Sequence, residues 1–258
     1  MDLYRFLPGR TRLLVSIPHA GTYLPPEIAR DLNATGRAMP DTDWYVDRLY
    51  DFLSAIGASV LVATHSRYVV DLNRAPDNAP LYPGLAASPV CPAETFSGKP
   101  LWRKGRAPDG AESARRVAQY WQPYHERLRR EIDTLRDRHG SVVLWDAHSI
   151  RSRVPRLFVG ALPVFNFGTN DGRSCDSGLA GRLFGHALQV AGSEAVLDGR
   201  FKGGHITRAY GDPARGVDAV QLELAQRCYM DEATGKWNAG KARQTRALLR
   251  ELLAIAIS

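Results

Sequence analysis

Short runs of apolar residues alternate with longer amphipathic segments in this chain, and this alternation restricts its possible folds more than any other feature. The runs are rich in Val, Ile and Leu with almost no polar interruption, which is typical of strands buried on both faces of a sheet. Five strands are predicted in this way, at Leu13–Ile17, Ser59–Ala63, Tyr68–Val70, Ser141–Trp145 and Val217–Leu224.

The segments between the runs place apolar residues at steps of three and four, as amphipathic helices do. Helices are predicted from Asp41 or Asp43 to Gly57, and over residues 110–138, 176–190 and 239–257. Pro123 falls inside the second of these and is expected to kink or divide it. The alternation of strands with long helices predicts an α/β fold, a three-layer αβα arrangement around a mixed, mainly parallel sheet.

The length of 258 residues fits one large domain or two small ones, and we predict a single domain over residues 1–258 because no linker or repeat is evident. One segment differs from the rest, since residues 73–109 contain seven prolines. A loop of this length in a compact domain usually has a function, so we predict that it lies near the site. The alternative is a proline-stiffened excursion on the surface.

Charge narrows the choice of partners. The chain carries 34 Lys and Arg against 27 Asp and Glu, a net charge of +7. This surplus is either spread over a solvated surface or gathered around an anionic ligand. No long run of basic residues occurs, so no nucleic-acid partner is predicted.

Cysteine usage and hydropathy restrict the cellular setting. The three cysteines are odd in number and far apart, which indicates a reduced, cytoplasmic protein. The first residues lack the pattern of a signal peptide, and no apolar stretch approaches the roughly 20 residues that cross a bilayer. We therefore predict a cytoplasmic protein without a membrane partner, and the oligomeric state is left open.

Two histidines follow predicted strands, and ligands of parallel sheets bind beyond the carboxyl ends of the strands. His19 comes directly after the first strand, and His148 follows the strand that ends at Trp145. Each could instead be a buried histidine bonded to a backbone carbonyl. With one carboxylate, Asp41 or Asp43, the pair would make a zinc site that keeps one position open. Asp146 could orient His148 or share its metal.

Glu223 is a carboxylate inside an otherwise apolar strand. A buried glutamate is costly unless it is paired or functional. Burial would raise its pKa towards neutrality, which suits a general base that acts on water. The alternative is an edge strand with Glu223 facing the solvent.

Several basic residues lie near these elements and could receive a small acid. Arginine pairs with a carboxylate through two parallel hydrogen bonds. Most arginines are surface partners of acidic residues, so each candidate alone is weak evidence. The candidates are Arg67, Arg74, Arg151, Lys202 and Arg208.

Seven blocks of the sequence together resemble a known family. They are Pro18-His19-Ala20-Gly21, Pro40-Asp41-Thr42-Asp43-Trp44, Asp71-Leu72-Asn73-Arg74, Tyr120-Trp121-Gln122-Pro123-Tyr124-His125, Asp146-Ala147-His148-Ser149-Ile150-Arg151-Ser152, Gly199-Arg200-Phe201-Lys202-Gly203-Gly204 and Gln221-Leu222-Glu223-Leu224-Ala225-Gln226. In this order they resemble the N-formylglutamate deformylase (N-formylglutamate amidohydrolase) family of histidine degradation. The resemblance implies a fold similar to that of zinc carboxypeptidases and a zinc-dependent hydrolysis of N-formyl-L-glutamate to formate and L-glutamate.

The resemblance also implies roles for single residues. His19 and His148 match the metal-binding histidines, with Asp43 as third ligand of one divalent ion, expected to be zinc. Glu223 matches the catalytic glutamate of carboxypeptidase-like enzymes, and the pair Asn73-Arg74 is similar to their pair for a substrate carboxylate. This chain departs from those enzymes in one respect. They supply two metal ligands as His-x-x-Glu, whereas the residue three after His19 is Thr22, so the third ligand must come from elsewhere in the chain.

The implied partner is a small dicarboxylate substrate. Two other functions stay open at this point. One is a deacylase or peptidase for another N-acyl acidic amino acid, and the other is a non-catalytic protein that binds an anionic ligand.

Overall fold

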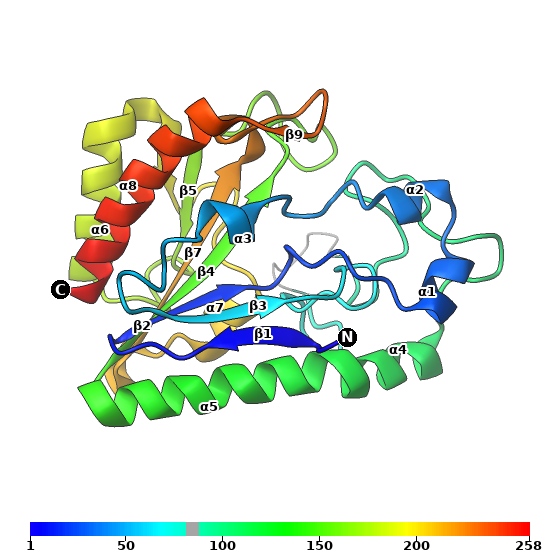
Figure 1. Cartoon of the computed structure of the whole chain (residues 1–258), viewed down its shortest axis with the longest axis horizontal. Helices are drawn as coiled ribbons and strands as arrows, with labels where there is room; N and C mark the ends of the chain where they lie inside the picture. The colour runs from blue at the N-terminus through cyan, green and yellow to red at the C-terminus, as the bar shows by residue number, and fades with distance from the viewer. Residues whose placement is uncertain (81–87) are drawn as a thin grey trace.

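The computed structural model describes residues 1–80 and 88–258 of the chain. Its centre is a seven-stranded sheet in the order β1-β3-β2-β4-β7-β5-β6 (Figure 1). These strands are β1 (Tyr4–Leu7), β2 (Leu13–Ile17), β3 (Ser59–Ala63), β4 (Val142–Ile150), β5 (Phe165–Gly168), β6 (Ala195–Leu197) and β7 (Val217–Ala225). A separate hairpin joins β8 (Met230–Asp231) and β9 (Lys236–Trp237). Residues 81–87, part of the predicted Pro-rich loop, lie outside the described residues.

Strand directions are mixed. β2 pairs in parallel with β3 and with β4, and the pairs β4–β7 and β5–β6 are also parallel. The pairs β1–β3 and β5–β7 are antiparallel. The prediction of a mixed, mainly parallel sheet is therefore confirmed.

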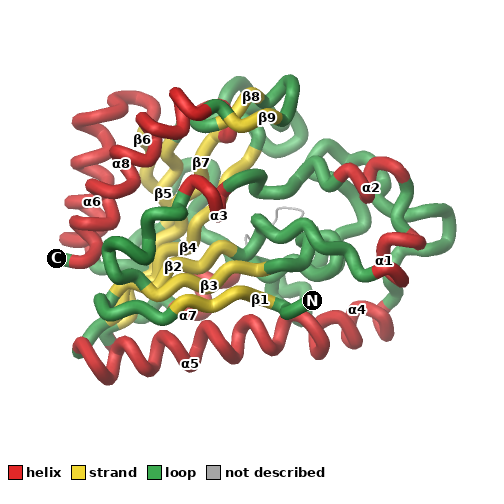
Figure 2. The backbone as a smooth tube through the Cα atoms, viewed as in Figure 1, coloured by secondary structure: helices red, strands yellow, loops and turns green. Residues whose placement is uncertain are grey.

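Helices cover both faces of the sheet and make three layers. α5 (Gln122–His139) and α7 (His205–Tyr210) contact one face, whereas α6 (Ser177–Ala191) and α8 (Ala239–Ile257) lie together on the other. Figures 1 and 2 show α5 along the lower edge and the α6–α8 pair at the upper left. The predicted αβα arrangement is confirmed.

Alternate residues of each strand supply the two apolar cores. In β4, Leu144 belongs to the core under α5, and Trp145 belongs to the core under α6 and α8. Trp145 is fully buried, and its Nε1 donates to the Tyr50 hydroxyl at 3.0 Å. A strand with apolar residues on both faces needs helices packed against both faces of its sheet. The near-continuous apolar runs therefore predicted a sheet between two helical layers.

Two sequence predictions are wrong. Tyr68–Val70 is buried but forms a turn, in which Val69 N donates to Ser66 O at 2.9 Å. An apolar run indicates burial, and burial does not require pairing with a strand. The helix predicted from Asp41 or Asp43 to Gly57 is only α3 (Val46–Leu49) followed by turns. It begins at Val46 because the backbone of Tyr45 is left-handed, with φ 62°.

The long helical segment 110–138 is divided, as predicted. It consists of α4 (Gly110–Arg116), a π-helical turn (Val117–Trp121) and α5. Pro123 lies in the first turn of α5, directly after the π-helical turn. The predicted helices at 176–190 and 239–257 correspond to α6 and α8.

Three strands of the central sheet, β1, β5 and β6, have no counterpart among the predictions, and neither has the hairpin β8–β9. Each of these three strands spans only three or four residues, too few to display a period. Within residues 1–80 and 88–258, no helix is both long enough and apolar enough to cross a bilayer.

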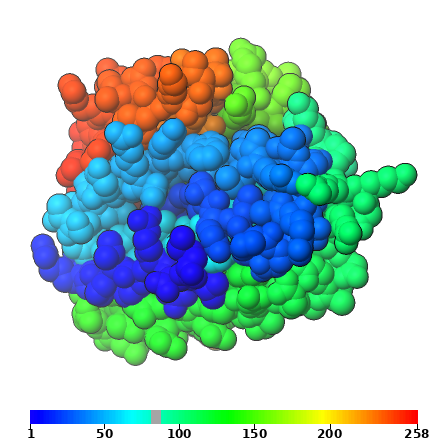
Figure 3. Space-filling model, turned by 45° about the vertical axis from the view of Figure 1, so that its right-hand side comes forward, coloured from blue at the N-terminus to red at the C-terminus, as the bar shows by residue number. Residues whose placement is uncertain are grey.

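The residues near 100 are tied to the N-terminal part of the chain. Asn33 N donates to Leu101 O and Arg103 N donates to Asp31 O, both at 2.9 Å. Figure 3 shows the blue region of α1 (Pro26–Asp31) and α2 (Ala34–Ala38) against blue-green residues at the right-hand side. These bonds fix the second half of the Pro-rich segment.

Candidate active site

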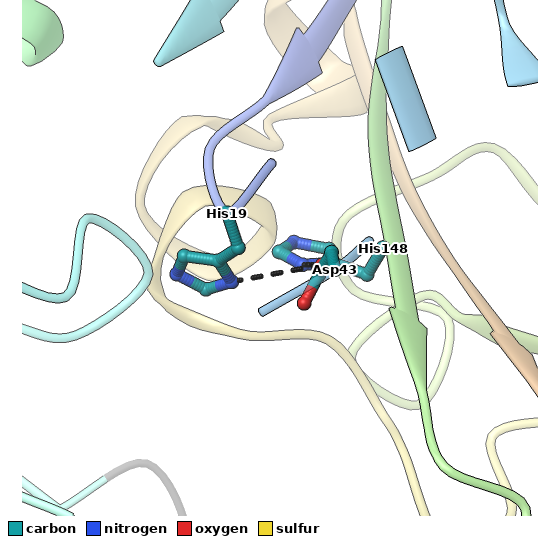
Figure 4. Close-up of side chains that lie close together, drawn as sticks. All are labelled: His19, Asp43 and His148. Carbon is teal, nitrogen blue, oxygen red and sulfur yellow. Dashed lines mark hydrogen bonds and ion pairs between the residues drawn. The ribbon is translucent and has the colours of Figure 1, made fainter. Parts of the chain in front are cut away.

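His19, Asp43 and His148 converge at the carboxyl end of the sheet, and we call them the triad (Figure 4). His19 follows β2, and His148 lies inside β4, which continues to Ile150 instead of ending at Trp145 as predicted. All three side chains are buried, and one ligand atom from each lies within 4.8 Å of the others. Asp43 Oδ2 is 3.1 Å from His148 Nδ1 and 3.9 Å from His19 Nδ1.

Two further aspartates orient the imidazoles. His19 Nε2 donates to Asp71 Oδ1 at 2.8 Å, and His148 Nε2 donates to Asp146 Oδ2 at 2.9 Å. Because Nε2 donates in both bonds, each Nδ1 is turned towards Asp43. His148 Nδ1 donates to Asp43 Oδ2 at 3.1 Å, and a metal ion bound at the triad would replace that proton. Carboxylate–histidine pairs of this kind are the usual support of a metal-binding histidine.

The triad fits a divalent metal ion. Among residues 1–80 and 88–258, His19 Nδ1 and Asp43 Oδ1 are buried and have no hydrogen-bond partner, although burying a polar atom without a hydrogen bond is costly. Two imidazole nitrogens and one carboxylate oxygen form the ligand set of catalytic zinc. The triad could therefore hold a zinc ion, which would also satisfy both orphaned atoms.

The alternative aspartates have other partners. Asp41 Oδ2 accepts hydrogen bonds from the Tyr68 hydroxyl at 2.7 Å and from Phe96 N at 2.8 Å. Asp146 orients His148. Of the three carboxylates that the sequence left open, Asp43 is the one grouped with both histidines.

Arg67 sets the charge around the triad. Its Nη2 donates to Asp71 Oδ2 at 2.7 Å, and its Nη1 is 3.6 Å from Asp43 Oδ1. Burial opposes ionisation of Asp71, but Arg67 and His19 hold the pKa of Asp71 well below its usual range. Burial and Arg67 lower the pKa of His19. Asp71 is thus a fixed anion and His19 is kept neutral, as a metal ligand must be.

Glu223 lies beside the triad on the neighbouring strand. β7 runs between β4 and β5, and Glu223 is opposite His148 in the register, so the alternative of a solvent-facing edge strand is wrong. Gln221 Nε2 donates to Glu223 Oε2 at 3.3 Å. Burial raises the pKa of Glu223 to about 8, although the His148 charge lowers it. A carboxyl group in this range can exchange a proton near neutral pH.

Asn73 connects the histidines to the start of α7. Its Nδ2 donates to Asp146 Oδ2 at 3.0 Å, and its Oδ1 accepts from Ile206 N at 2.8 Å. A Cβ added at Gly204 would lie 2.4 Å from Asn73 Nδ2, so only glycine allows this approach. The family resemblance predicts Asn73 at a substrate carboxylate. In the structure its side-chain amide donates a hydrogen bond to Asp146.

The predicted cations lie in different surroundings. Arg74 Nε donates to Ser88 Oγ at 3.0 Å, and Arg208 Nε donates to Gly203 O at 3.0 Å. Lys202 Nζ pairs with Asp171 at 2.8 Å. Only Arg67 among the five predicted cations is shown in an ion pair with a triad residue.

Arg151, the fifth predicted cation, lines a cavity of about 440 Å³ next to the triad. Asp41, Phe96, Ser149 and Gln226 also line this cavity. Ser149 links it to the triad, because Ser149 N donates to Asp43 Oδ2 at 3.1 Å. The cavity is therefore one residue away from Asp43.

Sequence reasoning assigned no role to several residues of the site. The sequence could have indicated Asp71 as a site residue, since it follows an apolar run as Asp146 does. It indicates Gln221 more weakly, as a polar residue in an apolar strand. Ser149 and Phe96 had none, because only the fold brings them to Asp43 and Arg67.

Comparison with known proteins assigns the chain to a family. A family model described as N-formylglutamate amidohydrolase matches residues 11–230. The N-formylglutamate deformylase of Pseudomonas putida is 51% identical over 249 residues, which are 96% of this chain and 93% of that protein. The N-formylglutamate deformylase of Pseudomonas aeruginosa is 51% identical over 253 residues, 98% of this chain and 95% of that protein.

Solved structures agree with this assignment. The crystal structure of N-formylglutamate amidohydrolase from Ralstonia eutropha JMP134 is similar with a TM-score of 0.82 and 27% identity, and the match covers 99% of this chain and 97% of that chain. A protein from Agrobacterium tumefaciens shares the fold, with a TM-score of 0.70 and 19% identity over 98% of this chain and 96% of that chain. The family model matches most of this chain, and about half of its residues are identical to those of each of the two Pseudomonas relatives. This chain therefore belongs to the N-formylglutamate amidohydrolase family.

Proposed function

We propose that this protein is a zinc-dependent N-formylglutamate deformylase, which hydrolyses N-formyl-L-glutamate to formate and L-glutamate. The proposal depends on the triad, in which two buried ligand atoms make no hydrogen bond to the described residues, and on Glu223, which lies opposite His148. The names of the relatives at 51% identity supply the substrate.

In this proposal His19, Asp43 and His148 hold one zinc ion. When bound, the ion supplies Lewis acidity, which polarises the formyl oxygen and favours ionisation of a water molecule. Asp71 and Asp146 keep the two imidazoles turned towards it through the bonds at Nε2.

Glu223 is the general base and then the general acid. It takes a proton from the attacking water, and the oxygen of that water adds to the formyl carbon. Glu223 then gives the proton to the glutamate nitrogen as the C–N bond breaks. The Arg67 guanidinium, 3.6 Å from Asp43 Oδ1, adds positive charge where the tetrahedral oxyanion would form.

The formyl group is small, so specificity depends mainly on the two carboxylates of the glutamyl part. Arg74 is our first choice for one carboxylate, because it follows Asn73 directly and Asn73 contacts both Asp146 and α7. The candidates for the other are Arg151, Arg208 and Lys202. An unpaired carboxylate in a site of this kind would cost several kcal/mol.

The proposal extends to the biological setting. A deformylase of N-formylglutamate would act in the cytoplasm, as the last step of a histidine degradation route. The enzyme would need no nucleic-acid or membrane partner for this reaction.

The test is formate release from N-formyl-L-glutamate by the zinc-loaded protein. N-formyl-L-aspartate and N-acetyl-L-glutamate serve as comparisons, and we expect both to be poorer substrates. No formate release from the named substrate would refute the proposal. Faster turnover of another N-acyl acidic amino acid would favour the alternative of a different deacylase or peptidase.

A further inference from the structure

The triad has two flanks with different chemistry. On the first flank lies Asn73, with Arg74 next to it in the chain and with the first turn of α7 bonded to it. On the second flank lies Asp43, followed by Arg67 and then by the ring of Phe96. The charge of Arg67 is already paired with Asp71 at 2.7 Å. Arg74, our first choice for a substrate carboxylate, lies on the first flank, so we place the glutamyl part there and the acyl group on the second flank.

Phe96 covers the second flank. The Arg67 Cζ atom lies 4.6 Å from the centre of the Phe96 ring, a cation–π contact that also shields the guanidinium. Phe96 also packs on a small apolar cluster formed by Ile150, Val154 and Leu162. Phe96 also lines the cavity of about 440 Å³. Phe96 therefore contacts Arg67 and borders this cavity, whereas Arg67 is not among the residues that line it.

Asp41 determines where the ring lies. The turn Thr95–Lys99, which we call the Phe96 turn, is closed by the bond from Thr95 N to Lys99 O at 2.9 Å. Asp41 Oδ2 accepts from Phe96 N at 2.8 Å and from the Tyr68 hydroxyl at 2.7 Å. Asp41 O accepts from Arg67 Nη1 at 3.3 Å. One aspartate therefore connects the Phe96 turn with the guanidinium that Phe96 covers.

We propose that Phe96 is a specificity-determining residue that limits the acyl group to formyl, and that Asp41 is the positioning residue that holds it there. The inference rests on the proposed deformylase function. A formyl group carries only hydrogen beyond its carbonyl, so a fixed wall beside Arg67 admits it and excludes a methyl group. Without the ring, the neighbouring cavity becomes available to a larger acyl group.

The experiment compares kcat/KM for N-acetyl-L-glutamate and N-formyl-L-glutamate in zinc-loaded wild type and Phe96→Ala. We expect the acetyl-to-formyl ratio to rise about tenfold or more, since one methyl group in an apolar pocket is worth 10–200-fold. Phe158→Ala is the matched control, because Phe158 packs on the same cluster and does not line the cavity. An unchanged ratio, or an equal rise in the control, would overturn the inference.

A comparison with N-formyl-L-aspartate tests which flank the cavity serves. Phe96→Ala could change the ratio of kcat/KM for N-formyl-L-glutamate to that for N-formyl-L-aspartate and leave the acetyl-to-formyl ratio unchanged. In that case the cavity receives the amino-acid part of the substrate, and the inference is wrong. Phe96→Leu keeps most of the apolar volume and provides a second variant if Phe96→Ala does not fold. It should shift the acyl ratio in the same direction by a smaller factor.

The positioning role of Asp41 is measured by hydrogen exchange at the Phe96 amide. Asp41→Ala removes the acceptor, so the amide should exchange faster and the acyl ratio should move as in Phe96→Ala. Asp41→Asn keeps one acceptor oxygen and should restore both readings. Equal effects of the two variants would show that the charge matters and not the hydrogen bond, which contradicts this role.

The two proposals fail in different ways. If wild type releases no formate, the deformylase function is wrong, whereas the exchange measurement still tests the contact between Asp41 and the Phe96 turn. If wild type releases formate and the acyl ratio does not respond to Phe96→Ala, only the inference about Phe96 fails.

Discussion

The Glu223 carboxyl group lies in an interior strand, opposite a histidine that we propose as a metal ligand. We propose it as the base because the other buried carboxylates of the site are engaged, Asp43 as the proposed metal ligand and Asp71 and Asp146 with the histidines. We expect Glu223→Gln to lower kcat by about 10²–10⁴-fold, the usual worth of a general base. Formate release and zinc content are measured together, and zinc should stay near one per chain.

Glu131 offers a matched control for this variant. It is also a buried glutamate beside the sheet, and its Oε1 accepts from Ser59 Oγ at 2.8 Å. Glu131→Gln should keep full turnover, since it lies on α5, away from the triad. If Glu223→Gln keeps ligand affinity and turnover as well, the non-catalytic alternative becomes the better account.

The pH dependence of kcat/KM follows from the same carboxyl group. A base must be ionised, so activity should be lost as the pH falls through the pKa of Glu223. Burial raises this pKa from 4.5 to about 8 in the metal-free chain, and a bound cation would draw it down again. We expect an acidic limb with a midpoint between these two values in a profile measured on the zinc-loaded enzyme. A midpoint below 4.5 would contradict this role of Glu223.

At the level of the elements, glycines in α6 weaken the layer that covers the sheet. A Cβ at Gly185 would meet no atom within 4 Å. Alanine costs less backbone entropy than glycine in a helix, so Gly185→Ala should raise the free energy of unfolding by about 0.5–1 kcal/mol. Chemical denaturation measures the change.

Gly168 provides the contrast, at the end of β5. A Cβ there would lie 2.4 Å from Gly203 N, so the backbone must shift. Gly168→Ala should lower the free energy of unfolding. If Gly168→Ala raised the free energy of unfolding as much as Gly185→Ala does, the backbone of β5 would not lie as close to Gly203 as the structure shows.

Elements also differ in how far the sequence predicts them. α8 has the predicted bounds 239–257 because an apolar stripe over 19 residues is unambiguous. The helix expected from Asp41 or Asp43 to Gly57 shrinks to α3, since Asp43 N donates to His19 O at 3.1 Å and its side chain belongs to the triad. Local periodicity cannot report such a contact between distant segments.

For the whole molecule, the proposed metal ion joins β2, the segment before α3 and β4. Because the ion would bind the folded chain and not the unfolded one, it should stabilise the fold by mass action. Removal of zinc with a chelator should abolish formate release and lower the midpoint of thermal unfolding, and added zinc should restore both. His19→Ala should show no response to either treatment. Release that persists after complete zinc removal would refute the metal-dependent mechanism.

The sequence by itself determined the layered α/β fold and indicated several of the residues that meet at its carboxyl edge. Apolar runs have to be buried on both faces, and the carboxyl ends of parallel strands meet at one edge, so His19, His148 and Glu223 were predicted near one another. Only the tertiary structure decided that Asp43, and not Asp41, lies with the histidines. It also brought Asp71 to His19 and Phe96 to Arg67. Those contacts join loops far apart in the chain, where no period in the sequence exists to be read.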